Sequence, residues 1–262
     1  MNLDLSSKNA VVCGSTQGLG WATAVELAFM GANVCLVARN EAKLQAKLSE
    51  LDHSKGQQHR YFVADFGDTE AVRKGIEAHL EQVGTVHILV NNTGGPAGGP
   101  ILEASPSAFE AAFAAHIICN HLLVQAVVPG MKQAGFGRII NVISTSVKQP
   151  INGLGVSNTI RAAVASWAKT LANELGPFGI TVNNVLPGYT KTARYDYVID
   201  NQAKQAGKTF EEIENKLVAD IPVRRIGLAE EFGAAAAFLC SPAAAYINGI
   251  NLPVDGGRLG TL

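Results

Sequence analysis

Three glycines near the start of the chain have the spacing of a phosphate-binding turn. Gly14, Gly18 and Gly20 follow a short apolar segment and open a segment with helical periodicity. Glycine permits a tight turn and a close approach of the backbone to a pyrophosphate, and a helix N-terminus offers free N–H groups. We therefore predict a dinucleotide site here, with an ordinary glycine turn as the alternative. The predicted site also includes Ser15, Gln17 and Leu19.

The residues after the second apolar segment bear on which dinucleotide this turn binds. That segment ends at Ala38, and Arg39 and Asn40 follow it. A site for NAD(H) places an acidic side chain here to accept hydrogen bonds from the ribose hydroxyls, and Ala38 cannot do this. The guanidinium of Arg39 suits a 2′-phosphate, and Lys43 adds positive charge one turn later. We predict NADP(H) in preference to NAD(H), with Arg39 and Asn40 in the site. The alternative is that Arg39 is a solvated loop arginine.

Short apolar segments alternate with helical segments along the whole chain, and these elements must position the glycine turn. The strand candidates, most of them nearly all apolar, are Ala10–Cys13, Asn33–Ala38, Arg60–Ala64, Val86–Val90, Gly137–Ile143, Ile180–Leu186 and Ile250–Val254. Helical periodicity marks Gly18–Met30, Glu41–Leu51, Thr69–Gln82, Ala108–Ala134, Gly155–Leu175 and Glu230–Leu239. Apolar strands that alternate with helices predict an α/β fold. We expect a Rossmann-type, doubly wound parallel sheet of about seven strands in one domain, residues 1–262.

Composition excludes several classes of protein. Hydrophobic residues make up 47% of the 262 residues and charged residues 16%, with a net charge of −1, so neither disorder nor nucleic-acid binding is expected. The four cysteines lack metal-ligand spacing, so we predict no metal site and a reducing, cytoplasmic location. No uninterrupted apolar run reaches the ~18 residues of a membrane span, so no membrane partner is expected.

One segment breaks the alternation. Residues 191–222 form a long, charged, helix-prone stretch between the sixth strand candidate and the last helix. Segments of this kind can close over a site as a lid, and a solvated surface excursion is the equal alternative.

Motifs along the whole chain resemble those of the short-chain dehydrogenase/reductase family, in particular its 3-oxoacyl-carrier-protein-reductase-like branch. Besides the glycine turn, they are Asp65 with Phe66, the Asn91–Gly94 signature, the Pro187–Gly188 turn with Thr190, and the Pro253–Gly257 signature. The resemblance implies that Asp65 contacts adenine. It implies that Asn92 and Gly94 contact the adjoining ribose, and that Pro187 and Gly188 lie beside the nicotinamide. It also implies a homodimer or homotetramer paired through the long helices.

The catalytic positions implied by the resemblance carry unusual residues. The family uses a Ser to polarise the carbonyl, a Tyr to donate the proton, a Lys four residues later and an Asn on an earlier helix. Ser144 matches the Ser, but Ser157 stands in place of the Tyr, Arg161 in place of the Lys, and His116 in place of the Asn. A serine hydroxyl is too weak an acid to replace a phenol, and an arginine stays protonated.

Another group must then supply the proton if the chain is a reductase. The candidates are Lys148, four residues after Ser144, and His116, with Tyr189, Tyr195 and Tyr197 as phenols from other directions. A solvated loop lysine, a core histidine and apolar packing of the tyrosines are the respective alternatives.

The predicted function is an NADP(H)-dependent oxidoreductase that moves hydride between nicotinamide and a small-molecule carbonyl or alcohol. Ser144 and Arg161 would face the reacting oxygen, and Ser157 would line the pocket. The alternative is a catalytically degenerate dinucleotide-binding protein that serves as a sensor, a partner subunit or a non-redox scaffold.

Overall fold

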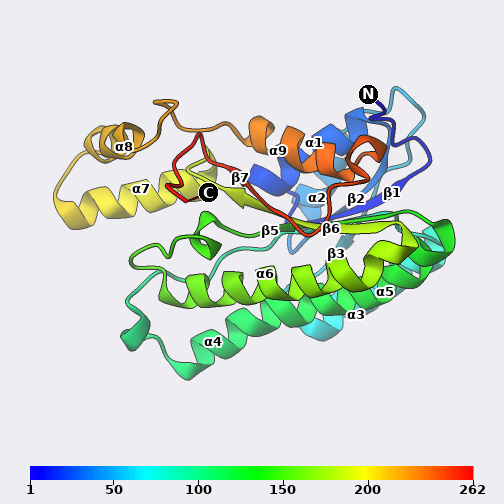
Figure 1. Cartoon of the computed structure of the whole chain (residues 1–262), viewed down its shortest axis with the longest axis horizontal. Helices are drawn as coiled ribbons and strands as arrows, with labels where there is room; N and C mark the ends of the chain where they lie inside the picture. Colours follow the sequence, from blue (N-terminus) through cyan, green and yellow to red (C-terminus); the bar gives the residue numbers. More distant parts are fainter. Residues whose placement is uncertain (262) are drawn as a thin grey trace.

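A seven-stranded, all-parallel sheet forms the centre of the computed structural model, which describes residues 1–261 (Figure 1). The strands are β1 (Asn9–Cys13), β2 (Asn33–Ala38), β3 (Arg60–Val63), β4 (Ile88–Asn91), β5 (Gly137–Val142), β6 (Ile180–Pro187) and β7 (Asn251–Val254). Each lies within two residues of its predicted bounds. The predicted doubly wound α/β fold is therefore confirmed.

The order of the strands determines where a ligand can bind. The sheet runs β3-β2-β1-β4-β5-β6-β7, so the winding reverses between β1 and β4. Connections from these two strands leave toward opposite edges and open a crevice at their carboxyl ends, where doubly wound sheets bind ligands. The glycine turn follows β1 and the Asn91–Gly94 signature begins at the end of β4. Both motifs thus meet at this crevice.

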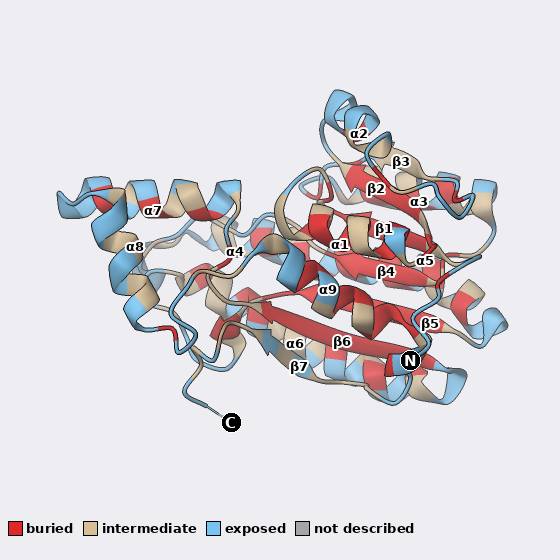
Figure 2. Ribbon diagram, turned by 90° about the horizontal axis from the view of Figure 1, so that it is seen from above, coloured by how far each residue is buried: buried red, intermediate tan, exposed pale blue. Residues whose placement is uncertain are grey.

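Two helical layers cover the sheet (Figure 1). One contains α1 (Gly18–Phe29), α2 (Glu41–Leu48) and α9 (Ala229–Cys240), and the other contains α3 (Thr69–Val83), α5 (Cys119–Ala134) and α6 (Gly155–Leu175). Figure 2 shows the central strands buried between them. Because both faces of β1, β4, β5 and β6 are covered, apolar residues can occupy nearly every position in these strands.

Helix α6 shows how burial on one face places a functional residue. Val156, Ile160, Val164 and Ala168 recur every four residues and are all buried. Arg161 lies on this same face, three residues before Val164, and only 8% of its surface is exposed. The apolar periodicity of the helix therefore carries a guanidinium into the interior.

The long helix predicted over Ala108–Ala134 is interrupted. It consists of α4 (Pro106–Phe113), a π-helical turn at Ala114–Ile118, and α5. By length and composition alone, the stretch Pro106–Ala134 could cross a membrane. The search for uninterrupted apolar runs in the sequence did not indicate this stretch. Its buried residues Leu123 and Val127 belong to the core beneath the sheet, and core helices meet the same criterion.

Residues 191–222 contain two helices, α7 (Ala193–Ala206) and α8 (Phe210–Ala219), which project beyond one end of the sheet (Figure 1). Thr192 caps α7 by accepting a hydrogen bond from the backbone of Tyr195 at 3.1 Å. Thr209 and Glu212 form a reciprocal capping box at the start of α8. These local caps explain why so polar a segment is helical.

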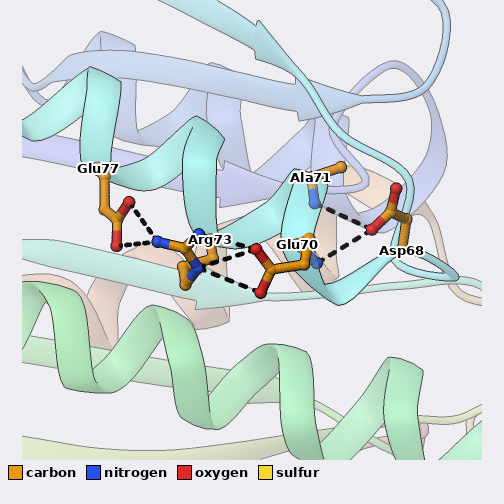
Figure 3. Close-up of polar contacts among 5 residues, drawn as sticks. All are labelled: Asp68, Glu70, Ala71, Arg73 and Glu77. Carbon is orange, nitrogen blue, oxygen red and sulfur yellow. Dashed lines mark hydrogen bonds and ion pairs between the residues drawn. The ribbon is translucent and has the colours of Figure 1, made fainter.

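Asp68 caps the N-terminus of helix α3, because its carboxylate accepts hydrogen bonds from the backbone N–H groups of Glu70 at 3.0 Å and Ala71 at 3.1 Å (Figure 3). Further along the helix, Arg73 bridges Glu70 and Glu77, three and four residues away. The cap satisfies N–H groups that have no partner within the helix.

We expect Asp68→Ala to lower the free energy of unfolding by about 1 kcal/mol, because it removes this cap. Asp68→Asn keeps an accepting oxygen and is expected to retain most of the stability. Urea denaturation followed by circular dichroism measures both. Equal midpoints for Asp68→Ala and the wild type would contradict the assignment.

Candidate active site

A single continuous cavity of about 1170 Å³ lies at the carboxyl ends of the strands. Its wall extends from the glycine turn and the end of β2 to the Pro187–Gly188 turn and helix α7. Ligand pockets are usually about 300–1,000 Å³. A cavity of this volume can therefore hold a dinucleotide and still leave room for a substrate.

The glycine turn is built for close contact. Gly14 and Gly18 have φ angles of +58° and +59°, which favour glycine, and a Cβ on Gly20 would lie 2.4 Å from the Gly14 carbonyl oxygen. The Asn92 amide donates hydrogen bonds to the carbonyl oxygens of Cys13 at 3.1 Å and Gly14 at 3.2 Å. The N-terminus of α1 is thus held against the cavity.

Most of the predicted residues of the glycine turn line the cavity: Gly14, Gln17, Gly18 and Leu19. Ser15 and Gly20 do not lie on its wall. Ser15 is fully buried, and its hydroxyl accepts a hydrogen bond from the Val37 backbone at 2.9 Å. Ser15 therefore ties the turn to β2, and Gly20 lets α1 pack closely behind it.

Positive charge gathers where the second strand ends. Arg39, Asn40 and Lys43 line the cavity together with Asp65 and Phe66. The Arg39 guanidinium is exposed, and its Nη1 lies 3.9 Å from Asp65 Oδ2. Asn40 caps α2 by accepting a hydrogen bond from the Lys43 backbone at 2.9 Å. Because the Arg39 side chain is exposed and its contact with Asp65 is long, the guanidinium can turn toward an anionic group.

Arg161 lies on the wall at the other end of the cavity, which also includes Asn92, Gly94, Pro187, Gly188 and Thr190. Its Nη1 donates a hydrogen bond to the Val142 carbonyl at 3.0 Å. No carboxylate in residues 1–261 forms an ion pair with it. Burial lowers the pKa of Arg161 to about 10, so the group stays cationic at neutral pH. A buried cation without a carboxylate counter-charge favours negative charge beside it.

Three other predicted catalytic residues, Ser144, Ser157 and Lys148, come from the loop after β5 and the start of α6. Ser144 follows β5, next to the lining residue Ile143, and its hydroxyl accepts a hydrogen bond from the Ser146 backbone at 3.0 Å. Ser157 lies in the first turn of α6 and is half-buried, and Lys148 is exposed on the loop after β5. The cavity wall contains none of these three side chains.

His116 lies in the π-helical turn, next to the lining residue Ala115. Such turns are often found at functional sites. Burial, reinforced by the charge of Arg161, lowers the pKa of His116 to about 3, against a hydrogen bond with the Gly94 backbone. The imidazole is therefore neutral at physiological pH.

The sequence patterns did not indicate several residues of the segment 191–222 that line the cavity. They are Thr192, Ala193, Arg194, Val198 and Ile199. Tyr195 and Ile199 are buried and one helical turn apart, a periodicity that could have marked this face of α7. Tyr189, considered only as a possible phenol, also lines the cavity.

These features fit a phosphorylated dinucleotide. The glycine turn and the start of α1 provide a cradle for pyrophosphate, and two cations stand where a 2′-phosphate would lie. Residues 1–261 contain no cluster of three or more His, Cys, Asp or Glu side chains placed to hold a metal ion.

Residues 14–258 match a protein-family model described as enoyl-(acyl carrier protein) reductase. The chain is 29% identical to NADPH-dependent reductase BacG of Bacillus subtilis, over 97% of the chain and 99% of that protein. It is 30% identical to gluconate 5-dehydrogenase of Gluconobacter oxydans, over 97% and 95%. The L-sorbose reductase of Gluconobacter frateurii, solved with NADPH and L-sorbose, superposes with a TM-score of 0.94 at 31% identity, and all of both chains are covered. The chain therefore belongs to the short-chain dehydrogenase/reductase family and is an NADP-dependent short-chain reductase.

Proposed function

We propose that this enzyme uses NADP(H), in preference to NAD(H), to interconvert a carbonyl and an alcohol on a small molecule, and that its proton donor is atypical. The observation that carries the proposal is the charge arrangement in one cavity. Arg39 and Lys43 stand at the end suited to a 2′-phosphate, and the buried Arg161 stands at the other end.

Each end of the cavity has its own proposed role. Gly14 and Gly18 bind the pyrophosphate, and Asp65 and Phe66 enclose the adenine. Asn92 and Gly94 contact the adjoining ribose. Pro187, Gly188 and Thr190 hold the nicotinamide end, all from loops that the sheet brings together.

The reacting oxygen is proposed to lie between Ser144 and Arg161. Bound NADPH supplies the hydride. The Ser144 hydroxyl polarises the carbonyl, and Arg161 stabilises the negative charge that develops on its oxygen.

The proton must come from a group other than Ser157. His116 is neutral at physiological pH and forms a hydrogen bond with the Gly94 backbone, so we assign it to positioning this loop. Lys148 remains a candidate acid, because the loop after β5 places it near Ser144.

The substrate is proposed to be a small polyfunctional carbonyl compound or alcohol. Relatives named for sorbose and gluconate support this class. The wall contributed by α7 combines apolar Val198 and Ile199 with polar Thr192 and Arg194, which suits a ligand with both kinds of surface.

Cofactor binding and turnover together test the proposal. NADPH and NADH would be titrated by fluorescence, and each complex would then be mixed with ketones, β-keto thioesters, ketoses and quinones while absorbance at 340 nm is followed. Tight NADPH binding with oxidation by a carbonyl probe is expected. Binding without oxidation by any probe would favour the non-redox alternative, and no binding would overturn the dinucleotide site.

Replacing Arg39 with glutamine is expected to weaken NADPH binding by roughly 10–100-fold, because a charge-assisted hydrogen bond contributes about 1.5–3 kcal/mol. NADH has no 2′-phosphate, so its affinity should change less than twofold. Arg73→Gln, on the exposed face of α3, is the matched control. Equal losses for the two cofactors would contradict the role of Arg39.

We also propose a homodimer or homotetramer. Large apolar side chains are exposed at the end of α4 and in the π-helical turn, with Phe113 at 43% and Ile118 at 39%. His121 of α5 and Trp167 of α6 pack edge to face. Light scattering after gel filtration measures the oligomeric state. We further propose that the chain is a single domain in which residues 191–222 serve as a lid. A cytoplasmic location is also proposed, and the four buried free cysteines are consistent with it.

A further inference from the structure

We propose that Tyr189 donates the proton to the reacting oxygen and that Arg258 positions its hydroxyl and stabilises the phenolate left behind. The inference rests on the proposed function, because it names the acid of that same site. The two residues are 69 positions apart in the sequence and meet at one wall of the cavity.

Tyr189 is in the right place for this role. It follows Gly188 at the carboxyl end of β6, is half-buried, and lines the same cavity as Arg161. The other phenol on the wall, Tyr195, already has a hydrogen-bond partner. Its hydroxyl donates a hydrogen bond to Glu214 at 3.1 Å, and burial together with this carboxylate raises the pKa of Tyr195. Tyr189 is thus the better placed of the two phenols.

Arg258 provides a cation at the Tyr189 hydroxyl. Its Nη2 donates to the phenolic oxygen at 3.5 Å, and its guanidinium carbon lies 4.6 Å from the centre of the ring. The distance is long, but catalytic hydrogen bonds often tighten only when substrate binds. No carboxylate in the described chain forms an ion pair with Arg258. Its Nε is buried and has no hydrogen-bond partner within residues 1–261. Its charge is therefore not neutralised by the protein.

The backbone brings the two side chains together. Gly188 donates a hydrogen bond to the Val254 carbonyl at 2.9 Å, and a Cβ on Gly188 would lie 2.6 Å from the Cα of Asp255. Only glycine lets the loop that carries Tyr189 approach the C-terminal loop so closely. The Tyr189 carbonyl is held in turn by the Gly227 N–H at 3.0 Å.

The turn that carries Arg258 is equally constrained. The Asp255 carboxylate accepts hydrogen bonds from the backbone of Gly257 at 2.9 Å and of Leu259 at 2.8 Å. These bonds fix the peptide on both sides of Arg258. The guanidinium therefore reaches the phenol from a rigid turn, as a positioning group requires.

The proposed step is balanced in atoms and electrons. As the carbonyl carbon accepts hydride from NADPH, the π electron pair of the C=O bond moves to oxygen, which takes the proton of the Tyr189 hydroxyl. The products are the alcohol, NADP⁺ and a Tyr189 phenolate next to Arg258, and water then returns the proton. The family resemblance implies a similar pairing, a Tyr beside a Lys, at the two positions that Ser157 and Arg161 occupy in this chain.

The test compares Tyr189→Phe with Tyr246→Phe, a matched control on a fully exposed tyrosine. The carbonyl probe is the one that the wild-type enzyme reduces fastest. Tyr189→Phe is expected to lower kcat by ~10²–10⁴-fold with unchanged NADPH affinity, because loss of a positioned acid has this effect. Arg258→Gln is expected to lower kcat at least tenfold, and Arg258→Lys to restore much of it.

A second readout does not depend on turnover. In complexes of enzyme, NADP⁺ and the same carbonyl probe labelled with ¹³C, the C=O stretching frequency reports the hydrogen bonds on the oxygen. Tyr189→Phe should raise this frequency toward its value in the absence of the phenol, and Tyr246→Phe should leave it unchanged.

The outcomes separate the two levels of the proposal. If the wild-type enzyme reduces the probe and Tyr189→Phe shows the same kcat and the same C=O stretching frequency, the role of Tyr189 is overturned. The proposed function would still stand. Loss of activity in Lys148→Gln but not in Tyr189→Phe would assign the acid to Lys148 instead. A wild-type enzyme that oxidises NADPH with none of the probes would overturn the proposed function and this inference with it.

Discussion

Replacing Arg161 with methionine is expected to lower kcat by about 10²–10³-fold, the usual effect of removing one group that stabilises a developing oxyanion. The side chain is 8% exposed, lines the cavity and has no carboxylate partner in residues 1–261, so its charge is available to the reacting oxygen. Its hydrogen bond to the Val142 carbonyl fixes one end of the guanidinium and leaves the other nitrogens for a ligand. Stopped-flow absorbance at 340 nm measures the loss.

The same substitution should not destabilise the protein. A buried cation without a counter-charge costs free energy to desolvate, and methionine fills a similar volume without that cost. We therefore expect the melting temperature of Arg161→Met to be at least that of the wild type. Arg161→Lys keeps the charge and should retain more activity than Arg161→Met. A large fall in melting temperature with full activity per folded molecule would show that Arg161 has a structural role only.

Replacing Ser144 with alanine is expected to reduce kcat by about 10²-fold or more, while the Kd for NADPH changes less than about threefold, because the hydroxyl would contact the substrate carbonyl and not the cofactor. Ser144 stands at the carboxyl end of β5, immediately after the lining residue Ile143. Steady-state kinetics with a carbonyl probe and fluorescence titration of NADPH separate the two effects.

Ser146 offers a matched control two residues away. Its hydroxyl is buried and has no hydrogen-bond partner within the described chain, so Ser146→Ala should leave kcat within about twofold. Equal activity losses in Ser144→Ala and Ser146→Ala would mean that the loop is merely disturbed. An active Ser144→Ala variant would remove Ser144 from the mechanism.

The fold could be predicted because its signals are local and repeated. The strands β1, β4, β5 and β6 are covered on both faces, so their sequences are mostly apolar, and α6 was predicted with its observed bounds. The break at Ala114–Ile118 could not be predicted, because a π-helical turn keeps the same apolar composition as the helix around it. The two helices within residues 191–222 are set by local caps at Thr192 and Thr209, which the predicted outline did not resolve.

The residues at the cofactor end of the candidate site could be predicted from the sequence better than those at the substrate end. The glycine turn, Arg39 and Asp65 lie at the ends of strands whose order the pattern implies, so most of the predicted cofactor residues line the cavity. Lining by Arg194, Val198 and Ile199 depends on where α7 lies against the cavity. The buried pair Tyr195 and Ile199 marks one face of this helix, but no pattern within the segment indicates that the helix borders the cavity. The contact between Tyr189 and Arg258 joins two loops that are distant in sequence, and only the folded chain reveals it.

Transfer of deuterium from [4,4-²H₂]NADPH tests the central claim most directly. The enzyme would be mixed with the labelled cofactor and the carbonyl probe in a single turnover, and the product analysed by mass spectrometry. Hydride transfer in this cavity predicts one deuterium on the carbinol carbon of the product, and the same labelled product formed about 10²–10³-fold more slowly in Arg161→Met. NADPH that binds tightly but is never oxidised, or a product without deuterium, would contradict the assignment of this chain as a hydride-transferring reductase.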